Sequence, residues 1–134
     1  MKEIRFAKKS DIQSLKEIWK KCFGDSDSYI DLYFNNRFKE SETLVLIEND
    51  EVASMLTMLP VKLNTTESEC VKAAMIYAVA TAPQLQGKGL STTLIDHAVG
   101  YLRENNVNAT VLVPSEKELF NFYSRLGYRA AFYL

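Results

Sequence analysis

Apolar residues in the first third of the chain recur at helical spacing, which predicts two helices behind a short strand. Residues 4–6 predict the strand, and Ser10 with Gln13 forms a capping box shortly after it. Two sets of apolar side chains then recur three or four positions apart, separated by a polar turn: Leu15, Ile18, Trp19 and Cys22, then Ile30, Tyr33, Phe34 and Phe38.

The middle of the chain has the composition of strands. Residues 43–48 and 51–63 are rich in Val, Leu, Met and Thr and are joined by Asn49 and Asp50, which predicts a hairpin. A polar turn follows, and residues 71–81 resume as an apolar run. We expect three antiparallel strands here.

The last third alternates between helix and strand. Residues 87–105 carry one apolar stripe, residues 109–113 form a short β-branched run, and Ser115 with Glu118 caps a further helix. A final strand is predicted at residues 128–134. The order β-α-α-β-β-β-α-β-α-β predicts an α/β (α+β) fold, with a mixed, mostly antiparallel six-stranded sheet and helices on both faces.

One break in this pattern carries candidate chemistry. The run VATAPQLQGKGLSTTL, residues 79–94, is extended up to Pro83 and becomes helical after Gly87 and Gly89. Glycines let the backbone turn tightly and approach a ligand, and the following helix directs unpaired N–H groups to the same place. From these residues alone, the turn is either a cradle for an anion or only a tight connection.

Two well-known phosphate loops are excluded at this turn. A Walker loop needs a glycine five residues before Gly87 and a Ser or Thr after Lys88, and the chain has neither. A dinucleotide fingerprint needs a third glycine where Thr92 stands.

Composition favours one globular domain, residues 1–134, of which 47% are hydrophobic and 25% charged. A formal net charge of −1 gives no general attraction to nucleic acid or to a membrane, so any anion site is local. The chain has neither a signal-peptide core nor a run of the ~18 apolar residues that a membrane span needs, which favours the cytoplasm. Cys22 and Cys70 lack metal-ligand spacing, and we interpret both as reduced, packed residues.

In its motifs and element order, the chain resembles the GNAT superfamily of acetyl-CoA-dependent N-acetyltransferases. Gln84, Gly87 and Gly89 match the family's Q/RxxGxG/A pyrophosphate motif. The segment FYSRLGY, residues 122–128, is similar to the family's FYxxxGF segment and follows in the expected order. The segment MLPVKL, residues 58–63, taken with the cradle, is also similar to the enhanced-intracellular-survival branch of acetyltransferases.

The resemblance implies that acetyl-CoA is the acyl donor and that a small-molecule or peptide amine is the acceptor. It implies that the main chain at Val79 and Thr81 binds the pantetheine arm and that Tyr123 donates a proton to the departing sulfur. Main-chain N–H groups from Gln86 through Ser91 would hold the pyrophosphate. The implied donor-binding residues are Val79, Thr81, Gln84, Gln86, Gly87, Lys88, Gly89, Leu90 and Ser91.

Several of these residues also have a plain structural interpretation. Periodicity alone places Tyr123 on the apolar face of its helix and favours a packed core residue. The match to the family segment favours the role of proton donor instead. The aromatic residues at positions 29–34 are interpreted as core or lid packing rather than as a substrate cage. No general base is assigned: a water relay, Asp31 or a group outside this chain remain as alternatives.

The chain departs from the family pattern in two places. The family usually has a further strand after residues 128–134, so we expect a trimmed chain, a piece of a longer protein, or a sheet completed by a partner such as a second copy. Ser115 and Glu116 stand where the family often has an Asn that contacts the cofactor. The alternative function is a non-catalytic acyl-CoA-binding or regulatory domain.

Overall fold

The structure is a computed structural model that describes residues 2–64, 70–107 and 109–112. Five strands and three α-helices follow one another in these residues, with short 3₁₀ turns between some of them. In chain order they are β1 Lys2–Phe6, α1 Ile12–Phe23, α2 Asp27–Asn36, β2 Thr43–Glu48, β3 Glu51–Asn64, β4 Cys70–Thr81, α3 Leu90–Glu104 and β5 Ala109–Val111. The predicted helix after Ser115 and the strand at 128–134 lie outside the described residues.

The strands form one sheet in the order β1-β2-β3-β4-β5. Neighbours from β1 to β4 pair antiparallel, and β5 pairs parallel to β4. The prediction of a mixed, mostly antiparallel sheet is therefore confirmed, while the described residues supply five of the six predicted strands.

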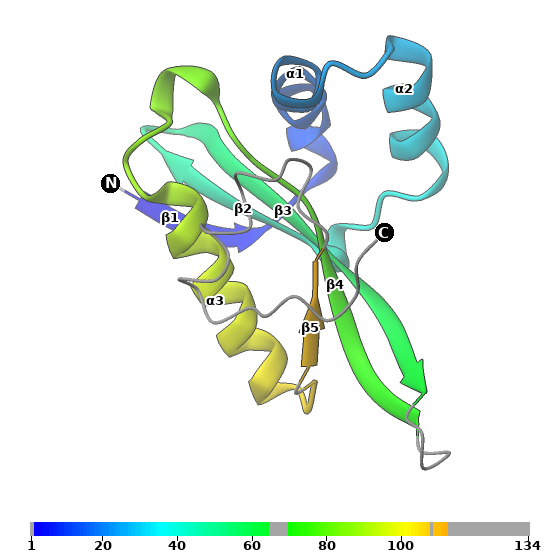
Figure 1. The fold of residues 1–134 in the computed structure, drawn as a ribbon. Coiled ribbons are helices and arrows are strands. Elements are labelled where there is room, and N and C mark those ends of the chain that lie inside the picture. Colours follow the sequence, from blue (N-terminus) through cyan, green and yellow to red (C-terminus); the bar gives the residue numbers. More distant parts are fainter. Residues whose placement is uncertain (1, 65–69, 108, 113–134) are drawn as a thin grey trace.

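Helices cover both faces of this sheet (Figure 1). On one face α3 packs through Leu90, Leu94 and Ile95 against strand residues that include Leu56 and Ile76. On the other face α1 and α2 bury a second cluster: Leu15, Ile18, Trp19, Ile30 and Phe34, with Val45, Met55, Ala80 and Ala82. Burying a side chain of this size contributes about 1.5–3 kcal/mol, so the two apolar layers hold the sheet between them.

The start of α1 differs from the prediction. The capping box expected from Ser10 and Gln13 does not form. The 3₁₀ turn Lys9–Asp11 precedes α1 instead, and the Asp11 carboxylate accepts a hydrogen bond from the Lys8 N–H at 2.8 Å. Arg5 holds the same carboxylate through two nitrogens at 2.7 and 3.1 Å. The Gln13 side chain instead donates to Glu17 at 3.4 Å. Asp11 is thus the N-cap residue of α1 by position only, without a side-chain hydrogen bond to the helix, and its carboxylate ties the 3₁₀ turn to β1 through Arg5.

The long hairpin of β3 and β4 extends beyond β2 (Figure 1). The last β2–β3 pair on this side is Thr43 with Thr57, so β3 is an edge strand at Pro60 among the described strands. A proline lacks the N–H that a central strand needs, and an edge position tolerates its absence.

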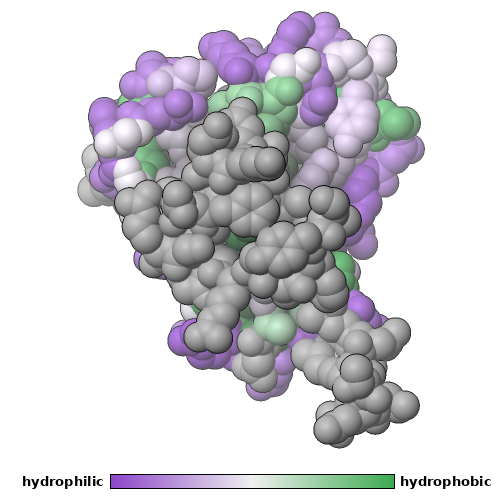
Figure 2. Space-filling view, viewed as in Figure 1, coloured by the Kyte–Doolittle hydropathy of each residue, from purple (hydrophilic) through white to green (hydrophobic). Residues whose placement is uncertain are grey.

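The surface shown in Figure 2 is mostly hydrophilic where it is coloured, with small separate hydrophobic areas. Phe23, Tyr29 and Leu32 are the exposed large hydrophobic residues of the described part. None of its helices combines the length and the apolar composition that crossing a membrane requires.

Candidate functional site

β4 contains a bulge next to the turn that the sequence singled out. Thr57 pairs with Tyr77 and Met55 pairs with Ala80, so Ala78 and Val79 together oppose a single residue of β3. Ala78 has a φ of 53°, in the left-handed region that non-glycine residues rarely adopt. The extra residue reverses the alternation of side chains, and Val79 therefore packs on the α3 face.

Beyond the bulge, one edge of β4 is separated from β5. The last β4–β5 pair joins Met75 to Val111, so no described strand accompanies β4 from Tyr77 to Thr81 on that side. The Ala82 N–H donates to the Ala53 carbonyl at 2.8 Å, which directs the main chain of Ala82 toward β3. Because antiparallel strands alternate, the main chain of Thr81 faces the opposite edge. We call this the open edge, since it has no neighbour among the described strands.

The strand leads into the predicted cradle through a 3₁₀ turn, Pro83–Leu85. Gly87 and Gly89 have φ values of 83° and 76°, and Gly89 is the N-cap of α3. The helix thus begins at Leu90, three residues later than the prediction from Gly87, because both glycines adopt the left-handed conformation. A Cβ atom built on either glycine meets nothing within 4 Å, so the space above the turn is open.

The cradle presents a row of main-chain donors. The N–H groups from Gly87 to Thr92 have no acceptor within the part of the chain that the structure describes. Leu90 is buried in the core and anchors the first turn, while Gly87, Lys88 and Gly89 are exposed. Oriented N–H groups at a helix N-terminus bind anions, and the Lys88 ammonium adds positive charge beside them. This arrangement suits a phosphate or diphosphate.

Thr81 connects the strand to the cradle through both its side chain and its main chain. Its hydroxyl lies 3.0 Å from Ser54 Oγ and 2.6 Å from Ser91 Oγ. Its carbonyl accepts hydrogen bonds from Gln86 Nε2 at 3.1 Å and from Cys22 Sγ at 3.3 Å. Burial raises the pKa of the Cys22 thiol, which keeps its proton available for this bond.

An aromatic group covers β4 beside the bulge on the face of α1 and α2. The Trp19 ring lies 4.9 Å from that of Tyr33, 5.9 Å from that of Tyr77 and 6.4 Å from that of Tyr29. Burial raises the pKa of Tyr33, and burial together with the nearby Tyr29 hydroxyl raises the pKa of Tyr77. Both phenols are therefore neutral at physiological pH, and the hydroxyl of Tyr77 lies 3.5 Å from that of Tyr29.

The acidic residues near this group are already engaged. Asp25 accepts a hydrogen bond from Trp19 Nε1 at 2.7 Å, and Asp27 pairs with Lys20 at 2.8 Å. Asp31, one of the alternatives for a base, pairs with Lys16 at 2.9 Å.

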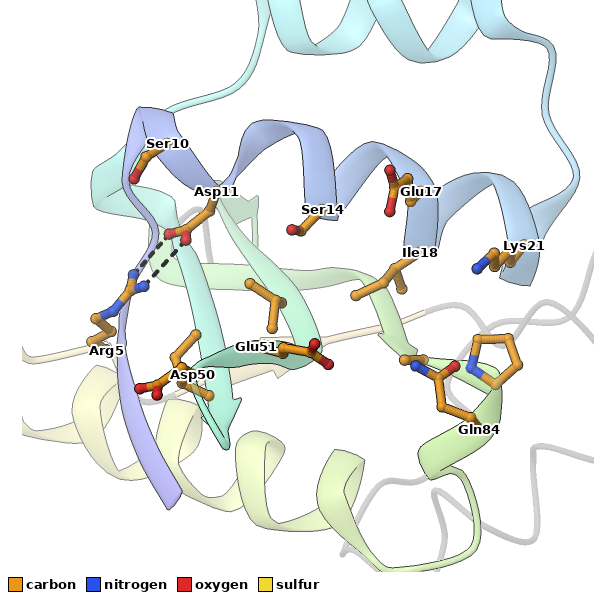
Figure 3. Close-up of a pocket in the computed structure, with 14 residues that line it drawn as sticks. Arg5, Ser10, Asp11, Ser14, Glu17, Ile18, Lys21, Asp50, Glu51 and Gln84 are labelled. Atoms are coloured by element: carbon orange, nitrogen blue, oxygen red, sulfur yellow. Dashed lines mark hydrogen bonds and ion pairs between the residues drawn. The ribbon is translucent and has the colours of Figure 1, made fainter. Parts of the chain in front are cut away.

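A groove of about 390 Å³ lies between α1, the β2–β3 turn and the 3₁₀ turn (Figure 3). Its lining includes Glu17, Lys21, Asp50, Glu51 and Gln84, together with the Arg5–Asp11 ion pair. Gln84 therefore lies on the α1 side of the turn. The residues from Gly87 to Thr92 do not line this groove, so we assign it no part in the anion site.

The structure brings most of the predicted site residues together and adds others. Val79, Thr81 and the segment from Gln86 to Ser91 form one continuous edge and turn, whereas Tyr123 lies outside the described residues. Sequence reasoning missed Ser54 and Cys22, which contact Thr81 from β3 and α1. A serine within the apolar run 51–63 was the only available signal, because contacts between distant segments leave no local pattern.

Comparison with known families gives a match over almost the entire chain. A family model described as an acetyltransferase (GNAT) domain matches residues 3–131. No curated protein sequence matches the chain significantly.

Solved structures with the same fold come from several organisms. A GCN5-related N-acetyltransferase from Anabaena variabilis is 26% identical with a TM-score of 0.80; the match covers 91% of this chain and 31% of that one. This chain thus spans about a third of the Anabaena protein. A predicted acetyltransferase from Clostridium acetobutylicum, solved with acetyl-CoA, is 22% identical with a TM-score of 0.78; the match covers 98% of this chain and 92% of that one. The glucosamine-6-phosphate N-acetyltransferase of Arabidopsis thaliana is 17% identical with a TM-score of 0.77; the match covers 100% of this chain and 95% of that one.

Proposed function

This chain belongs to the acetyltransferase (GNAT) domain family, and on that premise we propose that it is an N-acetyltransferase that moves an acetyl group from acetyl-CoA to a primary amine. The observation that carries the proposal is the continuity of the open β4 edge with the glycine cradle. One extended donor molecule with a diphosphate at one end fits this combination.

The two parts of the site bind different parts of the donor. The pantetheine arm lies along β4 from Val79 to Thr81 and adds to the open edge as a strand would. The diphosphate accepts hydrogen bonds from the main-chain N–H groups of residues 86–91. Each well-placed donor at the helix N-terminus contributes up to about 1 kcal/mol, and Lys88 adds screening charge.

The reaction is direct attack on the thioester. The lone pair of the neutral amine forms a bond to the carbonyl carbon, and the main-chain N–H near Val79 stabilises the oxyanion that develops. The carbon–sulfur bond then breaks, and the sulfur takes a proton from Tyr123. The nitrogen loses one proton, which passes through water back to the Tyr123 phenolate. Asp31 is assigned no role as a base, since its carboxylate is engaged by Lys16 at 2.9 Å.

A transfer assay tests the proposal. Purified protein with radiolabelled acetyl-CoA is expected to acetylate at least one member of a broad amine panel at a rate above the uncatalysed background. Saturable acetyl-CoA binding without transfer to any amine would contradict catalysis and favour the non-catalytic acyl-CoA-binding domain.

The role of Tyr123 has its own kinetic test. Tyr123→Phe removes the acidic proton and keeps the ring, so we expect kcat to fall by about tenfold or more while the dissociation constant for acetyl-CoA changes little. Tyr101→Phe is the matched control, because Tyr101 packs its ring on Phe6 at 5.2 Å, away from the cradle. An unchanged kcat in Tyr123→Phe would remove Tyr123 from the mechanism.

A further inference from the structure

The buried hydroxyl groups at the end of β4 form a chain with a defined direction. Ser54 is fully buried, and its hydroxyl donates to the Ala80 carbonyl at 2.9 Å. A serine hydroxyl has only one proton, so Ser54 Oγ can only accept in its contact with Thr81. Thr81 therefore donates to Ser54, and it must accept its own hydrogen bond from Ser91.

This direction changes what Ser91 offers to a ligand. The Ser91 hydroxyl donates its one proton to Thr81 Oγ1, at an oxygen–oxygen distance of 2.6 Å. The Ser91 oxygen therefore has only lone pairs to offer to a ligand, and lone pairs repel a phosphate. Only the main-chain N–H of Ser91, in the first turn of α3, is left to bind an anion. The Ser91 side chain consequently serves the fold of the site.

The Thr81 residue is held from four sides. The residue is 6% exposed, and its hydroxyl joins β3 to the first turn of α3 through Ser54 and Ser91. Its carbonyl is held by Cys22 from α1 and by Gln86 from the cradle itself. The place where the strand edge meets the cradle is thus fixed by hydrogen bonds that converge on one residue.

We propose that Thr81 is a positioning residue for the acyl donor, whose buried hydroxyl sets the spacing between the open edge of β4 and the N–H groups of the cradle. The inference rests on the proposed function, because acetyl-CoA contacts both parts at once. Loss of the Thr81 hydroxyl leaves the open edge of β4 and the cradle both present, and it shifts the cradle relative to the strand edge. A donor that contacts only the strand tolerates that shift, and a donor that also reaches the cradle does not.

The test compares acetyl-CoA with acetyl-pantetheine, which lacks the diphosphate. Thr81→Val keeps the shape of the side chain and removes its hydroxyl. We expect the dissociation constant for acetyl-CoA, measured by calorimetry, to rise about tenfold, as the loss of a buried hydrogen bond predicts. The dissociation constant for acetyl-pantetheine, measured by nuclear magnetic resonance titration, is expected to stay within about twofold. Thr81→Ser restores the hydroxyl and should recover most of the affinity for acetyl-CoA.

Two further variants complete the design. Ser91→Ala removes the donor to Thr81 while keeping the main-chain N–H, and it should reproduce the selective loss even if Thr81→Val does not fold. Thr43→Val is the matched control, because Thr43 is also a buried threonine whose hydroxyl bonds a carbonyl, that of Lys39 at 3.0 Å, in a strand that does not touch the cradle. It should change neither dissociation constant.

The outcomes separate this inference from the proposed function. The positioning role would be overturned if Thr81→Val weakened the binding of acetyl-CoA and of acetyl-pantetheine equally. It would also be overturned if the folded Thr81→Val and Ser91→Ala variants kept an unchanged affinity for acetyl-CoA. Absence of acetyl-CoA binding by the unaltered chain would instead contradict the proposed function itself.

Discussion

The carboxylate of Asp11 shows how one side chain fixes two elements at the residue scale. Asp11 is 8% exposed, and its carboxylate accepts two hydrogen bonds from Arg5 of β1 and one from the Lys8 N–H, at the start of the 3₁₀ turn Lys9–Asp11 that leads into α1. The Arg5 hydrogen bonds lower the pKa of Asp11 from its ordinary value of 3.8. Because the folded-state pKa is lowered, this stabilisation is complete above the ordinary pKa and is lost as the pH falls through the lowered value.

Asp11→Asn tests that contribution. At pH 7 the variant should lose about 1–3 kcal/mol of unfolding free energy, because it breaks charged hydrogen bonds in a mostly buried site. Urea unfolding at several pH values should show the difference shrinking below about pH 4 as the unaltered carboxylate takes up its proton. Asp27→Asn is the control, since the Asp27 side chain is 73% exposed and its pair with Lys20 should contribute little. A difference that is the same at pH 7 and pH 2 would contradict this account.

At the scale of elements, the β2–β3 turn is the clearest example of a local signal that decides structure. Asn49 and Asp50 have φ values of 53° and 64°, as the two central residues of a type I′ hairpin require. The flanking pair is Glu48 with Glu51, so the turn has two residues and fixes the register of the adjacent pairs, up to the shift between Leu46 and Ile47. The Asp50 backbone is strained relative to a glycine in the same place.

Asp50→Gly should therefore stabilise the protein. The expected gain is about 0.5–1 kcal/mol in unfolding free energy, because glycine adopts the positive φ without steric cost. Asp50→Ala makes the matched comparison, since alanine tolerates that φ less well than aspartate and should lower stability. Thermal unfolding of the three proteins gives the order directly, and a more stable alanine variant would refute the turn assignment.

Local patterns predicted the elements better than their junctions. Strand β2 was predicted at the residues where it is found, because its β-branched run ends at the Asn49–Asp50 turn. The start of α3 was predicted at Gly87 and lies at Leu90, because Gly87 and Gly89 both take the left-handed conformation. The bulge at Ala78 had no sequence signal, since an alanine with positive φ is imposed by the packing of the sheet on both helical layers.

For the candidate site, the sequence identified the segment and missed its supports. The glycine spacing together with the family resemblance predicted an anion cradle at residues 84–92, and the N–H groups from Gly87 to Thr92 have no acceptor among the described residues. The contacts of Thr81 with Ser54 and Cys22 join residues far apart in the chain. Such contacts depend on the assembled fold, so only the structure reveals them.

At the scale of the whole molecule, the site exists because the two faces of the sheet are covered differently. On one face, α3 brings its N-terminus to the end of β4, and on the other, α1 brings Cys22 to the same strand end (Figure 1). Between them, β4 leaves β5 after Met75, and no described strand accompanies this edge from Tyr77 to Thr81. The proposed donor site thus follows from the layer arrangement, and the central claim is that acetyl-CoA occupies this edge and cradle.

Calorimetric titration of acetyl-CoA into the unaltered chain and into a Gly87→Ala/Gly89→Ala variant tests this claim most directly. The unaltered chain should bind saturably with one site, and the variant should bind at least about tenfold more weakly, because alanine at both positive φ values displaces the N–H donors. Gly100→Ala, in the interior of α3 where a Cβ atom meets nothing within 4 Å, should keep full affinity. Equal affinity in all three proteins, or no binding by the unaltered chain, would contradict the account.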